Sequence, residues 1–285
     1  MGKPVIEVAE NAGACYGVKR ALKIAREAAD AGDTAHTLGS LIHNPRVVKE
    51  LAADGVGVAD TLDEAESGTL VLRSHGTAPQ VVAEARRRGF DVRDATCPYV
   101  SKVQHRAREL GQAGYAVVII GQPGHAEVEG IRAWGGDAVV AVADTADKLP
   151  DALPDKVGVV IQTTQSAERV AEVLSAVRER AGEVRVEETV CNATQERQAA
   201  ARELAGRVDV MIVVGGHNSG NTTRLVEICA PLCPAVHHIE GPEELKVSWL
   251  AGAERIGVTA GASTPQEQID DVCAALAALS GSREA

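Results

Sequence analysis

The chain has 285 residues and a formal net charge of −11 at pH 7. This excess of acidic residues argues against nucleic acid or an anionic membrane as its main partner. No run approaches the roughly 18–20 apolar residues of a transmembrane helix, and residues 1–8 are too short and too charged for a signal peptide. We therefore expect a cytoplasmic protein whose cysteines are reduced, metal-bound or buried.

Three stretches of the chain resemble one another. Each opens with a cysteine that precedes a basic, alanine-containing helical pattern: Cys15, Cys97 and Cys191. The residue 28 positions further along is polar in every stretch: His43, His125 and Ser219. A second polar loop then follows, with His75, Thr163 and Ser263. Self-similarity at a fixed spacing indicates repeated architecture, and a repeat of this length predicts three small α/β units.

Apolar runs and helix-start signals place the secondary structure along the chain. We expect strands at residues 3–8, 70–74, 115–121, 138–142, 157–162, 209–215 and 255–259. We expect helices at residues 16–32, 98–112, 166–181, 194–207 and 265–279. Further helices should start at Asn44-Pro45, where Asn is the N-cap, at a capping box formed by Thr77 and Gln80, and near Glu127.

Strands that alternate with helices predict an α/β fold with parallel sheets. We expect three similar small units, arranged pseudo-threefold around a central cavity. Their predicted bounds are 15–96, 97–190 and 191–285, with residues 1–14 packing near the centre. No low-complexity linker separates these units.

Polar residues occupy the loops in which a predicted strand leads into a helix. They are His43, His75, His125, Thr163, Ser219, Asn221 and Ser263. Helix N-termini and such donors bind anions, and no loop matches a P-loop or a dinucleotide fingerprint, so the expected ligand is a compact phosphorylated molecule. Any one of these residues alone is more often a helix cap, and Glu127 more often serves the helix dipole. The equal spacing in all three stretches favours a joint site.

The cysteines that open the stretches point to a metal centre. Cys97 precedes Pro98 at the start of a predicted helix, where the helix dipole favours a thiolate. Three thiolates from three units could hold an iron–sulfur cluster with one open iron, or zinc. The spacing favours the cluster, because structural zinc sites use closely spaced ligand pairs. The remaining cysteines should be buried apolar residues: Cys229, Cys233 and Cys273.

Motifs along the whole chain also carry a family resemblance. They lie at residues 12–18, 42–44, 74–76, 94–98, 124–130, 162–164, 218–221 and 259–263, and at Cys191. The most specific are Asp-Ala-Thr-Cys-Pro and Gly-His-Ala-Glu-Val-Glu-Gly. In these motifs the chain resembles the 4-hydroxy-3-methylbut-2-enyl diphosphate reductases, the IspH or LytB family.

The resemblance implies a reductase of the last step of the non-mevalonate isoprenoid pathway. Such an enzyme removes the substrate's allylic hydroxyl with two electrons and two protons, and it yields isopentenyl and dimethylallyl diphosphates plus water. The resemblance further implies one 4Fe–4S cluster on Cys15, Cys97 and Cys191 with an open iron site. A reduced ferredoxin or flavodoxin would be the electron donor.

The same resemblance assigns roles to the polar residues. Glu127 matches the proton donor, and Thr163 would lie near the substrate hydroxyl. The diphosphate would be held by His43, His75, His125, Ser219, Asn221 and Ser263. The chain departs from the family pattern at Ala14, where an aromatic residue is common, at Gly220, where many members have serine, and in its short C-terminal tail.

Two other functions stay open at the level of the sequence. One is a zinc-dependent hydrolase or lyase that acts on a phosphorylated small molecule. The other is a non-catalytic iron–sulfur protein that senses diphosphates or redox state.

Overall fold

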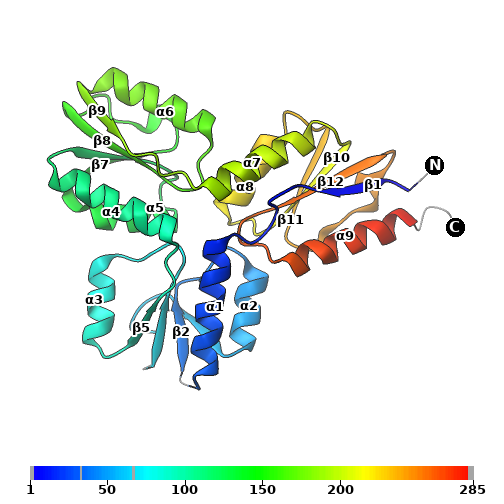
Figure 1. Cartoon of the computed structure of the whole chain (residues 1–285), viewed down its shortest axis with the longest axis horizontal. Coiled ribbons are helices and arrows are strands. Elements are labelled where there is room, and N and C mark those ends of the chain that lie inside the picture. Colours follow the sequence, from blue (N-terminus) through cyan, green and yellow to red (C-terminus); the bar gives the residue numbers. More distant parts are fainter. Residues whose placement is uncertain (1–2, 33, 66–67, 282–285) are drawn as a thin grey trace. The chain divides into compact units, whose positions relative to one another are not determined.

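The structure, a computed structural model, describes residues 3–32, 34–65 and 68–281 (Figure 1). Contacts divide the chain into two compact parts. Met1–Tyr16, His43–Pro45 and Asn192–Ala285 form one, which we call the terminal part. Gly17–Ile42 and Arg46–Cys191 form the other, which we call the middle part.

The chain forms three α/β units, each built on a parallel sheet of four strands. The first unit has strands β2 (Ala35–Leu38), β3 (Val56–Ala59), β4 (Thr69–Leu72) and β5 (Asp91–Asp94), with helices α1 (Tyr16–Asp30), α2 (Pro45–Ala53) and α3 (Pro79–Arg87). The second has β6 (Ala116–Ile120), β7 (Val139–Ala143), β8 (Lys156–Ile161) and β9 (Glu183–Val186), with α4 (Pro98–Gln112), α5 (Ala126–Gly135) and α6 (Ala167–Arg180). The third has β10 (Val210–Val214), β11 (Ala235–Ile239), β12 (Arg255–Ala260) and β1 (Val5–Val8), with α7 (Asn192–Ala205), α8 (Gly220–Cys229) and α9 (Gln266–Gly281).

The three sheets share one strand order. It runs β3-β2-β4-β5 in the first, β7-β6-β8-β9 in the second and β11-β10-β12-β1 in the third. In each sheet the chain leaves its two central strands toward opposite edges, which creates a crevice at their carboxyl ends. Ligands of parallel α/β sheets bind in such crevices. The predicted substrate-binding residues and Glu127 follow these central strands, whereas the three predicted metal ligands follow the edge strands β1, β5 and β9.

The central strands β6 and β10 have continuous apolar sequences because both of their faces are buried. Val118 and Ile120 of β6 belong to one buried aliphatic cluster, and Val117 and Ile119 belong to a second. Strand β10 divides its side chains in the same way. Successive side chains point to opposite faces of a strand, so a sheet that is covered by helices on both faces requires continuous apolar runs.

The prediction of an α/β fold with parallel sheets in three similar units is confirmed. Helix 98–112 matches α4 residue for residue, and the predicted strands agree with β1, β4, β6, β7, β8, β10 and β12 to within a few residues. The strands β2, β3, β5, β9 and β11 were not predicted. The arrangement of the units around a central cavity, their predicted bounds and the place of residues 1–14 stay predictions.

The predicted capping box at Thr77 is wrong. Helix α3 begins at Pro79, its N-cap is Ala78, and no side chain caps it. Thr77 is instead buried, with 9% of its surface exposed. Pro79 has no backbone N–H group, so the first turn has one donor fewer to satisfy, and this helix starts without a side-chain cap.

None of the helices within the described residues has the length and the apolar character to cross a membrane.

Candidate functional site

The three predicted metal ligands share the same position relative to a helix and the same kind of backbone hydrogen bond. Every one directly precedes a helix, namely α1, α4 or α7, and is partly exposed. Its backbone N–H donates to the loop after a central strand: Cys15 to the Ala262 carbonyl at 3.2 Å, Cys97 to Ser74 at 3.0 Å and Cys191 to Thr163 at 3.1 Å. The repeat seen in the sequence therefore extends to the hydrogen bonding of the cysteines.

The other cysteines differ in their surroundings. Cys229 and Cys233 lie in the aliphatic core of the third unit, and burial raises the pKa of the Cys229 thiol to about 12. Cys273 packs against the second core cluster of that unit, and burial raises its pKa as well. A thiol that ionises so reluctantly is a poor metal ligand, because the thiolate is the ligand form. The prediction that these three are core residues is confirmed for Cys229 and Cys233 and agrees with the partly buried Cys273.

Glu127 lies buried in the first turn of α5, with 2% of its surface exposed. Its Oε1 accepts the backbone N–H of Thr163 at 2.7 Å, and its Oε2 accepts the Thr163 hydroxyl at 2.8 Å. Burial raises the pKa of the Glu127 carboxyl to about 7, against the opposing effect of the two hydrogen bonds. A carboxyl group with this pKa can hold and release a proton near neutral pH.

His125 is the N-cap of α5. Its Nδ1 accepts the backbone N–H of Glu127 at 3.1 Å, so the ring proton sits on Nε2, which can donate to a ligand. The ring of His75 meets it edge to face, with 5.7 Å between the ring centroids. Both histidines, Glu127 and Thr163 belong to the middle part, so four predicted site residues occupy one body together with Cys97 and Cys191.

The loop that carries His75 is packed without spare room. Gly76 has a φ of +79°, and a Cβ placed on it would lie 2.0 Å from Nε2 of the buried Gln104. Gly130, in α5, faces the same amide, since its Cβ would lie 3.1 Å from Gln104 Nε2. Gln104 thus fixes the spacing between the His75 loop and the helix of Glu127. The sequence contained no signal for this role of Gln104.

We expect Gly76→Ala to destabilise the protein by about 2–5 kcal/mol, because left-handed strain and overpacking against Gln104 add. Gly89→Ala is the matched control. Gly89 has a φ of +89°, and among the described residues no heavy atom lies within 4 Å of its Cβ position. The control should be destabilised only by the left-handed strain, which costs about 1–2 kcal/mol. Denaturant unfolding of both variants measures the difference, and equal losses would contradict the packing role of Gln104.

The terminal part contains the other predicted anion-binding residues. Ser219 is the N-cap of α8, and its Oγ accepts the backbone N–H of Thr222 at 3.3 Å. Its own hydroxyl proton can then be donated outward. Asn221 has 6% of its surface exposed, and within the described residues neither its Nδ2 nor its Oδ1 has a hydrogen-bond partner. A buried amide without a partner is expected where a ligand supplies one.

His43 and Ser263 lie near this helix start. A Cβ placed on Gly216, in the loop of Ser219, would lie 2.7 Å from the His43 carbonyl. The Ser263 carbonyl accepts Nδ2 of Asn44 at 2.9 Å. The loops of His43, Ser219 and Ser263 therefore belong to one body, the terminal part, to which Cys15 also belongs.

The predicted ligand set stays a prediction. Its three cysteines are divided between the two parts of the chain. Over residues 3–32, 34–65 and 68–281, no three His, Cys, Asp or Glu side chains are grouped so that they could hold a metal ion.

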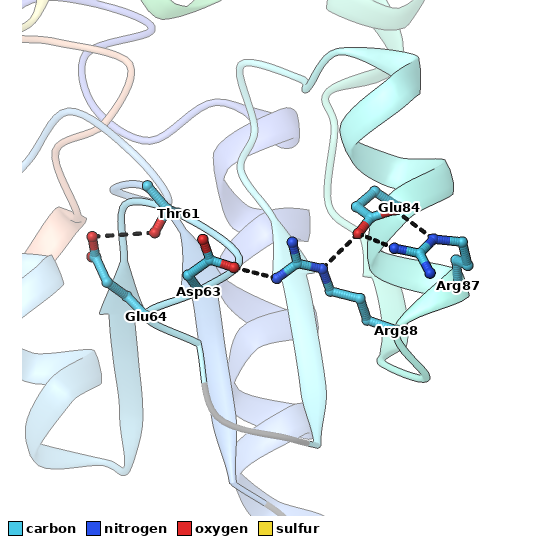
Figure 2. A network of polar contacts seen from close by, with 6 residues as sticks. All are labelled: Thr61, Asp63, Glu64, Glu84, Arg87 and Arg88. Atoms are coloured by element: carbon cyan, nitrogen blue, oxygen red, sulfur yellow. Dashed lines mark hydrogen bonds and ion pairs between the residues drawn. The ribbon is translucent and has the colours of Figure 1, made fainter.

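A cavity of about 550 Å³ opens in the first unit at the carboxyl ends of β2 and β4. Carboxylates line it: Asp60, Asp63, Glu84 and Glu129. Arg88 bridges two of them, at 2.5 Å from Asp63 and 2.7 Å from Glu84, and Arg87 also binds Glu84 (Figure 2). The four carboxylates outnumber the two guanidinium groups of the lining, Arg73 and Arg88, so the net negative charge disfavours a diphosphate in this cavity.

A family model described as LytB protein matches residues 6–277. The chain belongs to the LytB family. Its relatives from Pelobacter propionicus and Geobacter sulfurreducens are both named 4-hydroxy-3-methylbut-2-enyl diphosphate reductase. The first is 48% identical over 93% of this chain and 95% of the relative. The second is 47% identical over 94% of this chain and 95% of the relative.

Solved structures of LytB-family enzymes have the same fold. One is the (E)-4-hydroxy-3-methyl-but-2-enyl diphosphate reductase described as the terminal enzyme of the non-mevalonate pathway. It is 41% identical, with a TM-score of 0.70, and the match covers 95% of this chain and 99% of that one. The reductase from Plasmodium falciparum is 25% identical, with a TM-score of 0.90 over 96% of this chain and 88% of that one.

Proposed function

We propose that this chain reduces 4-hydroxy-3-methylbut-2-enyl diphosphate to isopentenyl and dimethylallyl diphosphates, the last step of the non-mevalonate pathway. Two electrons and two protons enter, the allylic C–O bond breaks, and water leaves. The observation that carries this proposal is the 48% identity with a reductase of that name over 93% of the chain. The buried acid Glu127, with its pKa near neutrality, adds a chemical reason.

The proposal includes one 4Fe–4S cluster on Cys15, Cys97 and Cys191, with one iron open to substrate. The donor set fits: three partly exposed cysteines precede helices, where the orphan N–H groups favour negative charge. Such a cluster supplies single electrons and a Lewis-acidic iron for the departing hydroxyl. The reducing partner is a ferredoxin or flavodoxin, and the reaction takes place in the cytoplasm.

Glu127 and Thr163 would deliver the proton together. Because Glu127 Oε1 accepts a backbone N–H, a proton on the carboxyl group sits on Oε2. The Thr163 oxygen, 2.8 Å from Oε2, then accepts that proton's hydrogen bond and turns its own hydroxyl hydrogen away from the carboxyl group. That hydrogen is directed at the substrate, so a proton can pass from Glu127 through Thr163.

The diphosphate would be held by neutral donors and helix N-termini. His125 offers Nε2–H, Ser219 a hydroxyl and Asn221 an amide without a partner in the described chain. The starts of α5 and α8 add the positive ends of two helix dipoles. His43, His75 and Ser263 complete the proposed set.

The run Arg86-Arg87-Arg88 does not favour docking of an acidic electron donor. Arg87 and Arg88 are already paired with Glu84 and Asp63 (Figure 2). The run therefore serves as the charged end of α3.

Anaerobically purified protein tests the proposal directly. We expect about four iron and four sulfide ions per chain and reduction of 4-hydroxy-3-methylbut-2-enyl diphosphate by a low-potential donor. Mössbauer spectra should show one iron site that shifts when substrate is added. Stoichiometric zinc with activity in air would instead support a hydrolase or lyase, and substrate binding without reduction would support a sensor.

A further inference from the structure

A polar chain, buried at two of its three residues, joins the three loops of the terminal part that carry His43, Ser219 and Ser263. It consists of Asn44, Gln268 and Glu240. None of these was singled out as a site residue from the sequence. Asn44 and Gln268 have 1% and 6% of their surface exposed, so their amides must be satisfied inside the protein.

Asn44 forms the first junction. Its Nδ2 donates one hydrogen to the Ser263 carbonyl at 2.9 Å and the other to Gln268 Oε1 at 3.0 Å. An amide nitrogen has two hydrogens, and both are used here. The residue beside His43 is thus bound to the backbone of Ser263 and to the first turn of α9.

Gln268 forms the second junction. Its Nε2 donates to the backbone carbonyl of Glu240, which directly follows β11. The Glu240 carboxylate in turn accepts the backbone N–H of His217 at 2.8 Å, in the loop that leads to Ser219. Through this one side chain, the His43 and Ser263 loops are connected to the Ser219 loop.

The geometry points to Gln268 as a positioning residue that holds these three loops at the spacing of a diphosphate. This inference rests on the proposed function, because it takes His43, Ser219 and Ser263 as diphosphate contacts. Gln268 acts through Asn44 and Glu240 and is not itself placed against the ligand. Each half of its amide has one defined partner. A side chain of equal length without these atoms therefore removes one hydrogen bond from Asn44 Nδ2 and one from the backbone carbonyl of Glu240.

The test compares Gln268→Met with Gln266→Met in the cluster-loaded protein. Methionine keeps the length and the packing of glutamine and removes both hydrogen bonds. Gln266 is an exposed residue of the same helix turn, and its Nε2 donates to Asp270 Oδ1 at 2.9 Å. Calorimetry measures binding of inorganic diphosphate, and steady-state kinetics measure KM and kcat for the diphosphate substrate.

We expect Gln268→Met to raise the Kd for diphosphate and the KM about tenfold, with kcat within about twofold of the wild type. Gln266→Met should match the wild type in all three. Gln268→Glu keeps the acceptor for Asn44 and loses the donor to Glu240, so its Kd should lie between the two. This second variant provides the test if the methionine variant does not fold.

A Gln268→Met protein with a lowered melting temperature and wild-type Kd and KM would reduce Gln268 to a structural residue and overturn the inference. A wild-type chain that binds no diphosphate would overturn it too. Failure of the proposed function looks different, because the wild type would then bind diphosphate and not reduce the substrate.

Discussion

Glu127→Gln should lower kcat by about 10²–10⁴-fold while the protein still binds substrate and keeps its iron. Glutamine has nearly the shape of glutamate and can still accept the Thr163 N–H group that now meets Oε1 at 2.7 Å. Glutamine cannot supply the proton that the proposed mechanism passes through the Thr163 hydroxyl. Turnover under strictly anaerobic conditions with a chemical reductant measures the loss without depending on the protein electron donor.

Glu129→Gln is the matched control, since Glu129 lies in the same helix turn, is exposed and lines the acidic cavity. Its kcat should equal that of the wild type. Full turnover by Glu127→Gln would remove Glu127 from the proton role and leave it as a buried acid that orients Thr163.

The pH dependence of the reaction should also follow Glu127. Burial raises the pKa of its carboxyl from 4.5 to about 7, and the proposed reaction uses the protonated form. The rate should fall as pH rises through 7, and in Glu127→Gln the residual rate should not show this step. Because the folded-state pKa is the higher one, the native protein binds the extra proton between pH 4.5 and 7 and loses stability over that window as pH rises, by about 3 kcal/mol. The difference between the melting temperatures at pH 5 and pH 8 should therefore be smaller in Glu127→Gln than in the wild type.

Cys97→Ser should abolish reductase activity together with the bound iron and sulfide. A serine hydroxyl in that position stays protonated at neutral pH and is a poor ligand for iron, so two thiolates would have to hold the whole cluster. Iron and sulfide per chain in anaerobically purified protein measure the loss apart from turnover. We expect both to fall from about four toward zero.

Cys273→Ser serves as the control, because Cys273 packs against the core of the third unit. It should keep its iron, its sulfide and its activity. A Cys97→Ser protein with a full complement of iron and sulfide would show that the cluster ligands lie elsewhere.

Continuous apolar runs made the central strands predictable. Strand β6 reads Ala-Val-Val-Ile-Ile and β10 reads Val-Met-Ile-Val-Val, and both are buried on two faces. The central strand β2, which reads Ala-His-Thr-Leu, lacks such a run and was not predicted, whereas the apolar edge strand β7 was. The edge strands β5 and β9 escaped prediction because they are short and carry charges. Strand β5 reads Asp-Val-Arg-Asp and β9 reads Glu-Val-Arg-Val, and their charged side chains are exposed or half-buried. Such strands form because a neighbour offers a ladder of hydrogen bonds, and a local pattern does not contain that neighbour.

Equal spacing before or at helix starts made the three cysteines, His125 and Ser219 predictable as site candidates, whereas the role of Glu127 came from the family resemblance. The structure then added the partners that no spacing reveals. Thr163 meets Glu127 across 36 positions of sequence, and Asn44 meets Gln268 across 224. Thr77 shows the opposite error, since a capping pattern was present and α3 starts without using it.

By itself, the sequence determined the parallel α/β class, most of the helix starts and the family, because periodicity, N-terminal signals and motifs are local properties of the chain. Only the tertiary structure decided that β1, from the N-terminus, completes the sheet of the last unit beside β12, with Val5 opposite Arg255. It also decided that Asn44 and Gln268 connect three loops, and that burial brings the pKa of Glu127 to about 7. The physical reason is common to all three. Strand pairing, buried hydrogen bonds and desolvation depend on which distant residues come into contact, and only the folded chain creates those contacts.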